Sequence, residues 1–378
     1  MWSVRTVHPR ARLAGALAAL SAVALVTSCG GSTPPTVAPS STASPSPSGS
    51  AHTYDVTAYG AHGDGQTDST QPFTQAIAAA EAAGGGTVYV PAGQYIFSAA
   101  KTANPASISI EGAAPITLMG ASRDTTSLIE GKADKGLLGV HIDGSTVEGL
   151  TLDTKTHEGG AAVFVQANHT NLLHTRVLGG SRHFAIYYAG PKGAKPLTPL
   201  YNVGNTVTDL DLNEVDCNDG FSWSFQQQGT ITDVTHTGSR LALYVDETTT
   251  VTNYNYTPGS QQCGARNGFW ITPPADRITI TAFTSSGEGG KVGVISAAGA
   301  GKVAKNVTIS GETMTGSGYN LTIGDVSNLV LDGCKLGTNN IVVNAVAAAQ
   351  GTVSHCTYGQ VVRNGSTTAQ VAISVLPT

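Results

Sequence analysis

The sequence predicts an all-β solenoid in which parallel strands stack into a β-helix behind an N-terminal capping helix. Three observations support this prediction. Short alternating strands recur at intervals of roughly 20–30 residues, a period typical of solenoids. No helical pattern lies between these strands. Charged residues make up only 12% of the chain, which suits stacked strands better than solvated helices. The alternative is a large β-sandwich, which does not require the register to recur so often.

Two sets of short strands alternate along the chain, with Val, Ile or Leu at matching positions. The first set comprises STVEGLTLDT from Ser145, NTVTDLDLNEV from Asn205, GTITDVTHTG from Gly229, TVTNYNYTPG from Thr250, DRITITAFTSSG from Asp276, KNVTISGETMTG from Lys305, SNLVLDGCKLG from Ser327 and QGTVSHCTYG from Gln350. The second set comprises AAVFVQA from Ala161, FAIYYAG from Phe184, GFSWSFQ from Gly220, LALYVDE from Leu241, GFWITPP from Gly268, KVGVISA from Lys291, YNLTIGD from Tyr319 and NIVVNA from Asn340. Two or three such strands per turn, stacked in parallel, make a β-helix.

One helix is expected, near the start of this array. Thr67 or Asp68 can N-cap a helix over QPFTQAIAAAEAA, which is rich in alanine. The glycines at 84–86 end it and allow a sharp turn into the strand TVYVP. Because the open end of a β-stack exposes apolar core and unpaired strand edges, the helix is predicted to be a lid over the first turn.

The segment AYGAHGDGQTDST, followed by AIAAA and GGGTVYVPAGQY, resembles the N-terminal motif of pectate-lyase-like proteins. These are right-handed, single-stranded parallel β-helices that include polygalacturonase and rhamnogalacturonase relatives and phage tailspikes. The resemblance implies that fold and a carbohydrate-active role, although a fold alone does not determine an activity. The sequence lacks the Asn-Thr-Asp, Asp-Asp, Gly-His-Gly-like and Arg-Ile-Lys motifs of polygalacturonases, which puts that particular activity in doubt.

The N-terminal region is predicted to direct export and not to fold. Residues 1–28 are expected to be a lipoprotein signal peptide: a basic start, an apolar run too short for a membrane span, and VTSC at Cys29, which resembles a bacterial lipobox. Residues 29–52 are rich in Ser, Pro and Thr and are expected to form a disordered tether. Residues 53–378 are the β-helix domain. We expect lipid anchoring on the outer face of a bacterial membrane; the alternative is secretion as a free protein.

The charge of the chain argues against a nucleic-acid partner. The formal net charge is −5, and removing the three arginines of the signal peptide leaves −8. No basic run appears in the sequence. The expected partner is a polysaccharide, with membrane contact through the lipid anchor only, and the domain is expected to be a monomer.

A column of polar residues is predicted just before the second strand set. His183, Asp219, Arg240 and Arg266 occupy similar places in neighbouring coils, which lie about 4.8 Å apart. Asp216 lies in the turn ahead of this column and Asp246 follows the next strand. The functional interpretation is a sugar-binding groove with acid, base and charge-stabilising groups. The alternative is turn chemistry, with Asp219 and Arg240 as a structural ion pair.

Three modes of action remain open for this column. A hydrolase needs two carboxyl groups flanking the bond, and Asp219, Asp216 and Asp246 are the candidates, with Arg240 orienting them; hydrolysis is slightly favoured. A lyase acting on a uronic acid by β-elimination needs a base and a positive group or Ca²⁺ beside the sugar carboxylate, for which Arg240, Arg266 and Lys291 are available. The third mode is non-catalytic glycan binding. No cofactor is expected apart from Ca²⁺ in the lyase case, and no cluster of His or Cys predicts a transition-metal site.

Aromatic residues recur in the second strand set. Phe164, Tyr187, Trp223 and Tyr244 fall at one aligned place, and Trp270 lies one place away. If this face points outward, the rings form a stacking platform for sugars, so that Tyr187, Trp223, Tyr244 and Trp270 bind substrate together with His183 and Arg266. If it points inward, the rings form an aromatic core. Periodicity does not decide, because both faces of these strands are rather apolar.

Four cysteines beyond Cys29 form an even set in an exported protein. Cys334 and Cys356 occupy the same place in consecutive repeats, and adjacent strands bring such Cα atoms within disulfide range. A bridge between them is therefore predicted. A second bridge, between Cys217 and Cys263, requires the loop before Cys263 to fold back.

Overall fold

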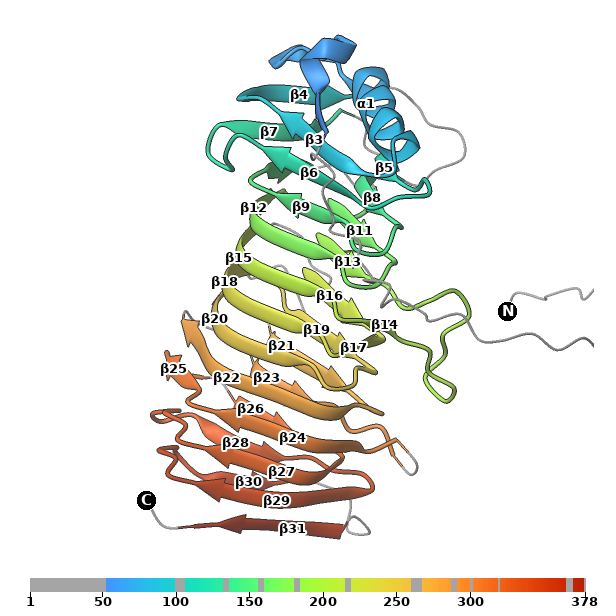
Figure 1. Cartoon of the computed structure of the whole chain (residues 1–378). Coiled ribbons are helices and arrows are strands. Elements are labelled where there is room, and N and C mark those ends of the chain that lie inside the picture. The colour runs from blue at the N-terminus through green and yellow to red at the C-terminus, as the bar shows by residue number, and fades with distance from the viewer. Residues whose placement is uncertain are drawn as a thin grey trace, which may run out of the picture. The chain divides into compact units, whose positions relative to one another are not determined.

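The computed structural model describes residues 52–376, except for 99–105, 132–135, 156–159, 180–183, 215–218, 260–266, 287–290, 300–301, 319 and 365–369. In this part of the chain, parallel strands stack coil upon coil along one axis (Figure 1). The predicted right-handed parallel β-helix is confirmed. The predicted signal peptide, Cys29 and the tether up to residue 51 lie outside the described residues, so the lipid-anchored location stays a prediction.

Helix α1 (Thr70–Ala82) covers the N-terminal end of the stack (Figure 1). Its buried face includes Phe73, whose ring lies 5.4 Å from Tyr95 and 4.9 Å from Phe97, measured between ring centroids. The N-cap residue is Ser69, whose side chain makes no capping hydrogen bond. Asp68 accepts the N–H of Thr70 instead, at 3.1 Å. The prediction of a capping helix is therefore confirmed.

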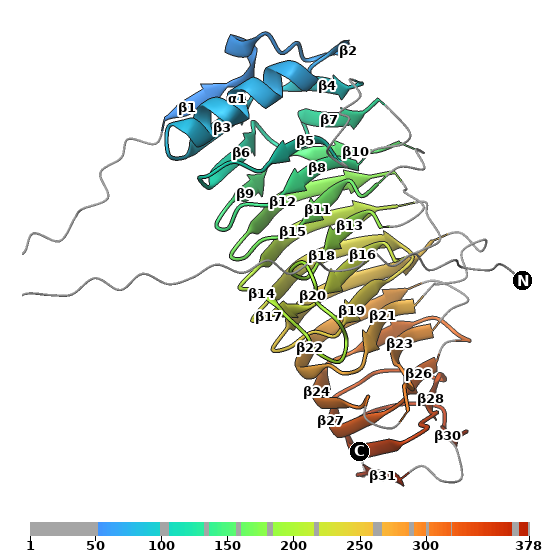
Figure 2. The ribbon, with the colours of Figure 1, turned by 90° about the vertical axis from the view of Figure 1, so that its right-hand side faces the viewer.

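Sheet B is formed by the predicted second strand set, preceded by two more strands and followed by one. Its strands, in spatial order, are β5 (Ala106–Ile110), β8 (Gly136–Val140), β11 (Val163–Val165), β13 (Ile186–Tyr188), β16 (Phe221–Ser224), β19 (Leu241–Tyr244), β21 (Asn267–Thr272), β23 (Lys291–Ile295), β26 (Asn320–Ile323), β28 (Asn340–Val343) and β30 (Val361–Arg363). Every pairing between neighbours in this sheet is parallel. Figure 2 shows these strands one below another.

Sheet A contains the predicted first strand set. Its strands are β1 (Thr53–Asp55), β2 (Asp64–Asp68), β3 (Gly86–Val90), β4 (Gly93–Phe97), β6 (Ile116–Gly120), β7 (Thr126–Glu130), β9 (Thr146–Glu148), β10 (Thr151–Asp153), β12 (Asn171–Leu178), β15 (Thr206–Asn213), β18 (Thr230–Gly238), β20 (Thr250–Pro258), β22 (Asp276–Ser286), β24 (Ala304–Ser310), β25 (Thr313–Thr315), β27 (Val326–Asp332), β29 (Ala348–Ser354) and β31 (Gln370–Val375). A short 3₁₀ turn, η1 (Val56–Tyr59), follows β1, and β14 (Asn202–Val203) pairs with β17 (Gln226–Gln227) at the corner between the sheets.

Single residues with left-handed backbone bend the chain at the same place in successive coils. One column of such residues lies within sheet A: Gly149, His174, Asp209, Asp233, Asn253, Ala282, Gly311, Gly333 and His355, all with φ between 48° and 66°. A second column lies where the chain enters sheet A: His169, Gly204, Gln228, Thr248, Arg277, Asn306 and Asn328. Gly, Asn, Asp and His tolerate this conformation best. Each bend thus turns the strand while using one residue, so neighbouring coils stay in register.

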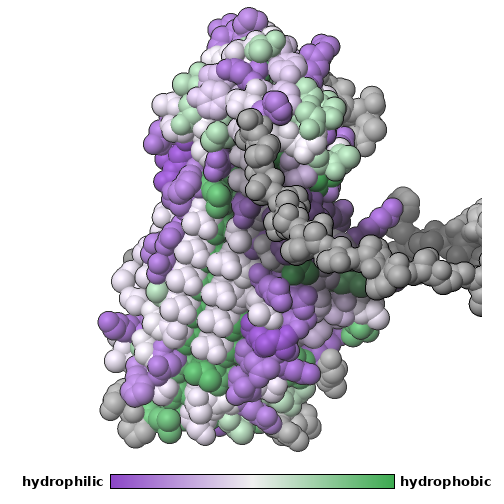
Figure 3. Space-filling model, in the orientation of Figure 1, coloured by the Kyte–Doolittle hydropathy of each residue, from purple (hydrophilic) through white to green (hydrophobic). Residues whose placement is uncertain are grey.

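The outer face of sheet A carries threonines in register. One row joins Thr206, Thr230, Thr250, Thr279 and Thr308, and a second row two residues along joins Thr208, Thr232, Thr252, Thr281 and Ser310. Between the two rows lie buried Val and Ile side chains that face the core. In Figure 3, pale columns run down the stack while purple hydrophilic residues gather mainly along the flanks. These two rows hold no aromatic ring.

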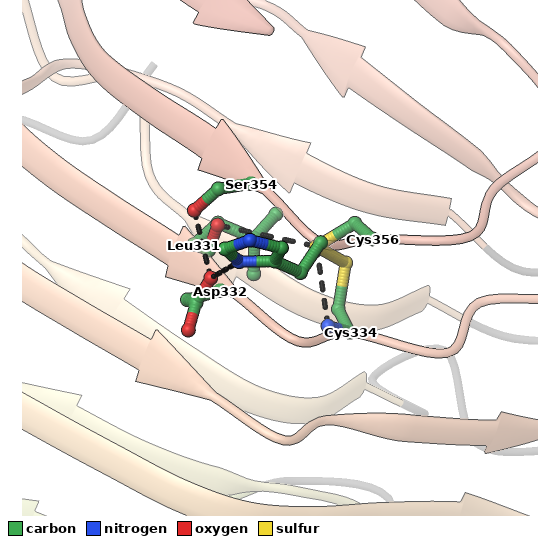
Figure 4. Close-up of a disulfide and its surroundings, with 6 residues drawn as sticks. Leu331, Asp332, Cys334, Ser354 and Cys356 are labelled. Atoms are coloured by element: carbon green, nitrogen blue, oxygen red, sulfur yellow. Dashed lines mark hydrogen bonds and ion pairs between the residues drawn. A yellow bond between two sulfur atoms is a disulfide. The ribbon is translucent and has the colours of Figure 1, made fainter. Parts of the chain in front are cut away.

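The predicted disulfide between Cys334 and Cys356 is confirmed (Figure 4). The two Cα atoms lie 4.4 Å apart, because Lys335 and Thr357 pair in adjacent coils and hold the preceding cysteines side by side. Both cysteines are buried. The predicted pair Cys217 and Cys263 lies outside the described residues.

A carboxyl group is buried in the C-terminal half of the core. Glu312 is fully buried between the neighbouring positions Phe283 and Cys334. Within the described part of the chain, neither of its carboxyl oxygens has a hydrogen-bond partner. Burial raises the pKa of Glu312 from 4.5 to about 8, because an uncompensated charge in an apolar interior is costly.

We expect this group to make stability depend on pH. Between pH 4.5 and 8 the carboxyl is protonated in the folded state and ionised in the unfolded state, so stability falls as pH rises, by roughly 3–5 kcal/mol in total. In Glu312→Gln this contribution is absent, and the variant is more stable than the wild type at pH 8. Chemical denaturation at several pH values measures both effects, with Glu148→Gln, at a partly exposed glutamate, as the control. An unchanged pH slope in Glu312→Gln would contradict the assignment.

Candidate functional site

One row of outward-facing side chains crosses sheet B. Register pairs place Phe164 beside Tyr187, Tyr187 beside Ser222, Ser222 beside Ala242, and Ala242 beside Trp270. Each of these residues lies between two inward-facing residues of its own strand, such as Leu241 and Leu243 around Ala242. The rings of Phe164, Tyr187 and Trp270 are partly exposed. The row therefore presents aromatic rings at both ends and small side chains in the middle.

The predicted position of Trp223 is wrong. The register places Trp223 beside Tyr188 and Leu243, both of which face the core, and Trp223 is fully buried. Its indole N–H donates to the hydroxyl of Thr249 at 3.3 Å. A shift of one residue moves a side chain to the opposite face of a strand, and the aromatic alignment made from the sequence contained such a shift.

The other predicted aromatic residues do face outward, at two positions along the strands. Trp270 shares the row of Tyr187, whereas Tyr244 lies two residues beyond Ala242, beside Ser224. The ring of Tyr244 packs edge-on against Phe225, with centroids 5.5 Å apart. Burial and the neighbouring Tyr244 raise the pKa of the Tyr187 phenol, so this hydroxyl stays protonated at neutral pH. We name the outward surface from Tyr187 to Trp270, including Ser222, Ala242 and Tyr244, the sheet B face.

Asp219, Arg240 and Trp270 form a cluster at the edge of the sheet B face. Arg240 Nε donates a hydrogen bond to Asp219 Oδ1, and each side chain is 19% exposed. The guanidinium also lies over the Trp270 ring, 4.5 Å from its centroid, a cation–π contact. The two rigid contacts fix the arginine next to the face. The structure thus brings together three of the predicted site residues.

Buried groups hold this edge from behind. Glu214 is buried, and its Oε1 accepts the hydroxyl of Ser239 at 2.7 Å and also its backbone N–H. His236 Nε2 lies 3.4 Å from the same oxygen, and His236 Nδ1 lies 2.7 Å from the Tyr254 hydroxyl. Since Ser239 directly precedes Arg240, this network fixes the backbone at Arg240. The sequence analysis did not identify Glu214 and His236. Their only signal in the sequence is that each is a single polar residue in or beside a strand with apolar core residues.

The predicted grouping of Asp246 with Asp219 is wrong. Asp219 precedes β16, whereas Asp246 follows β19, and the six residue steps from Arg240 to Asp246 span roughly 20 Å of extended chain. Asp246 is fully buried, and its Oδ1 accepts the N–H of Gln226 at 2.8 Å. Burial raises the pKa of this carboxyl well above its usual range. Asp246 therefore belongs to the corner between the sheets and not to the sheet B face.

The remaining predicted site residues cannot be placed. Asp216, His183 and Arg266 lie outside the described residues, and the side chain of Lys291 does as well. In the described part of the chain, no group of three or more His, Cys, Asp or Glu side chains is arranged to hold a metal ion. The same residues include no helix that is long and apolar enough to cross a membrane.

A pocket of about 300 Å³ opens at the N-terminal end of the sheet B face. Its aromatic walls are Phe164, Phe184, Tyr187 and the imidazole of His141, and small residues complete the lining: Ala106, Gly136, Gly160 and Ala161. Ring centroids are 4.6 Å apart for Phe184 and Tyr187, and 5.5 Å apart for Phe164 and Tyr187. We name this cavity the aromatic pocket. Tyr187 belongs to both the pocket and the sheet B face.

His141 is a pocket residue that the sequence reading did not identify. Its ring lies 5.5 Å from that of Phe164 and reaches over Gly139, where a Cβ atom would lie 3.0 Å from His141 Nε2. Burial lowers the pKa of His141, with Glu111 opposing the shift. The imidazole is therefore neutral at neutral pH. A glycine at 139, in an otherwise apolar strand, was the available sign that a larger side chain lies above it.

Comparisons with known proteins give a set of relatives whose names describe carbohydrate-active enzymes. Alginate lyase 7 of Azotobacter vinelandii is 33% identical over 162 residues, which cover 43% of this chain and 17% of that protein. Mannuronan C5-epimerase AlgE2 of the same organism is 40% identical over 78 residues, covering 21% of this chain and 8% of that protein. The chain thus spans less than a fifth of the length of these curated relatives.

The solved structures that match this chain are more distant in sequence. The A-module of mannuronan C-5 epimerase AlgE4 from Azotobacter vinelandii is 15% identical with a TM-score of 0.47, and the match covers 86% of this chain and 98% of that one. The catalytic unit of a GH87 α-1,3-glucanase from Streptomyces thermodiastaticus is 16% identical with a TM-score of 0.48, covering 88% of this chain and 69% of that one.

A family model described as rhamnogalacturonase A/epimerase, pectate lyase-like, matches residues 53–269. The match begins with β1 and ends within β21, so it includes the capping helix, the aromatic pocket and most of the sheet B face. It also agrees with the resemblance seen in the N-terminal motif. Because this match covers more than half of the chain, the protein belongs to the rhamnogalacturonase A/epimerase family of pectate-lyase-like proteins.

Proposed function

We propose that the sheet B face binds a polysaccharide. The observation that carries this proposal is the outward row of Tyr187, Ser222, Ala242 and Trp270. Three coil spacings separate the two aromatic rings, about 14 Å in all, and only small side chains lie between them. Ser222 and Ala242 are themselves buried, so the two partly exposed rings are the surfaces offered to a chain of sugars, whose apolar faces pack on aromatic rings. A solenoid surface is also elongated, as a polymer requires.

We further propose that the glycan carries uronic acid and that Arg240 receives its carboxylate. Among the described residues, Arg240 bonds to Asp219 through Nε, which leaves its two terminal nitrogens for a second carboxylate. Arginine pairs with carboxylates by such parallel N–H donors. The names of the curated relatives, an alginate lyase and mannuronan C5-epimerases, support a uronate polymer as the ligand.

The chemistry proposed for this site is removal of the sugar proton next to the carboxylate. Asp219 is the proton acceptor beside Arg240, and Arg240 stabilises the negative charge that develops on the carboxylate. In an elimination, the electron pair left by the proton forms a carbon–carbon double bond, and the bond to the linkage oxygen breaks. That oxygen leaves with the bonding pair and takes up a proton from water. In an epimerisation, a proton returns to the opposite face of the same carbon and the chain stays intact.

Hydrolysis becomes the second candidate. It was favoured because three carboxylates were expected to lie together, and hydrolysis needs two of them on either side of the bond. Asp246 lies at the other end of the strands and is buried, so it does not face Asp219 across a sugar. Asp216 lies outside the described residues. The original reason for preferring hydrolysis therefore no longer applies, and the reaction products must distinguish the two.

Replacing Trp270 by alanine is expected to weaken glycan binding about tenfold, because one stacking surface is lost. Affinity electrophoresis in gels containing a uronate polymer measures this change. Val342→Ala is the matched control, since Val342 lies on the same outward row three coils further on. If the gel with uronate polymer slowed the Trp270→Ala variant as much as the wild type, the glycan would have to bind somewhere other than the sheet B face.

Replacing Arg240 by glutamine is expected to lower the reaction rate at least a hundredfold, because the developing carboxylate charge loses its partner. The wild type and the variant are incubated with several uronate polymers, and unsaturated uronate, reducing ends and sugar configuration are followed together. Arg277→Gln is the control, because Arg277 is also ion-paired, with Glu247 and Asp276, but lies at the corner entering sheet A.

Each pattern of products has one meaning in this experiment. Unsaturated ends indicate elimination, and inverted sugars without cleavage indicate epimerisation. Reducing ends without unsaturated sugar would show hydrolysis and overturn the proposed chemistry. Glycan binding without any product would mean that the face is a binding surface only.

A further inference from the structure

The aromatic pocket differs in chemistry from the sheet B face beside it. Arg240 and Asp219 bring charge to the far end of the face, whereas the described residues that line the pocket include no Asp, Glu, Lys or Arg. Among these described residues, the polar side-chain atoms are the phenol of Tyr187 and the imidazole of His141. Burial holds both in their neutral forms at neutral pH, since it raises the pKa of Tyr187 and lowers that of His141. A ligand carboxylate would lose its water there without gaining a charged partner among the described lining residues.

The size of the pocket suits one ring-sized group. An apolar cavity of about 150 Å³ is large enough to bind benzene, and this pocket holds about 300 Å³. A substituted aromatic ring therefore fits, whereas a length of polysaccharide does not. Ligand pockets of this kind start at about this volume.

The walls of the pocket are arranged to receive an aromatic ring. Phe164 and Tyr187 stand edge to face, with their planes 67° apart, and the plane of Phe184 is tilted by 37° from that of Tyr187. Aromatic rings attract one another in offset and edge-to-face arrangements. A ring that enters the pocket meets three such partners, and a polar tip on it meets His141 or the Tyr187 hydroxyl.

We propose that the aromatic pocket binds an uncharged aromatic ring that is attached to the glycan as an ester substituent. The attachment rests on the proposed function, because Tyr187 is both a wall of the pocket and the first residue of the sheet B face. A glycan that spans the rings of Tyr187 and Trp270 thus places a substituent of its terminal sugar at the mouth of the pocket. The protein would accordingly prefer aryl-esterified uronate chains to unmodified ones.

The first test uses methyl benzoate and benzoate as probes, titrated into the domain and followed by ligand-observed NMR. We expect saturable binding of methyl benzoate, and binding of charged benzoate at least tenfold weaker. Ala161→Phe fills the pocket and Phe164→Ala removes a wall, and both should weaken the binding of methyl benzoate at least tenfold. Trp270→Ala, outside the pocket, should leave it unchanged. The proposal is wrong if wild-type protein shows no saturable binding, if benzoate binds equally well, or if neither pocket variant has an effect.

The second test compares a uronate oligosaccharide with and without a benzoyl ester. The esterified form should bind about tenfold more tightly, and Ala161→Phe, which fills the pocket from outside the aromatic row, should abolish this difference while leaving binding of the unmodified form intact. Equal affinities for the two forms would overturn the link between pocket and glycan. If methyl benzoate binds and neither oligosaccharide does, the proposed function fails while the ring site stands, so the two failures are distinguishable.

Discussion

The structure depends on one constraint: each coil must return to the same register as the coil before it. The chain meets this constraint by bending at single left-handed residues, such as His174, Asp209, Asp233 and Asn253 in successive coils. Because each of these coils bends at one equivalent residue, the strands on either side of the bend stay in register with those of the next coil. Backbone hydrogen bonds therefore continue from coil to coil. Side chains at equivalent positions therefore stack about 4.8 Å apart, and a property of one coil becomes a row on the surface.

The same register decides which residues form core and which form a site. Trp223 and Trp270 both lie in sheet B strands, yet one faces the core and the other the solvent because their positions differ by one in the aligned coils. Sheet A presents rows of threonine on its outer face, whereas sheet B presents rings and small side chains beside an arginine. The sheets share one core, and among the described residues the outer face of sheet B carries the aromatic row on which we propose that sugars stack.

The architecture was largely predictable from the sequence, whereas the composition of the site was not. The strand sets, the capping helix and the Cys334–Cys356 bridge follow from local patterns that repeat. The direction of the aromatic rings does not follow from the sequence. Both faces of the sheet B strands are apolar, so the periodicity does not show which face points to the core. Asp246 looked close to Asp219 because the sequence does not show which end of a strand a turn residue occupies. His141 was missed because a single histidine after an apolar strand resembles ordinary core.

The central claim is that a glycan lies along the outer face of sheet B, from Tyr187 to Trp270. A crystal structure of the domain with a uronate oligosaccharide bound tests it most directly. The account predicts sugar rings between Tyr187 and Trp270, in van der Waals contact with the two aromatic rings, and a sugar carboxylate on the terminal nitrogens of Arg240. An oligosaccharide ordered on the threonine rows of sheet A, with the sheet B face empty, would contradict it.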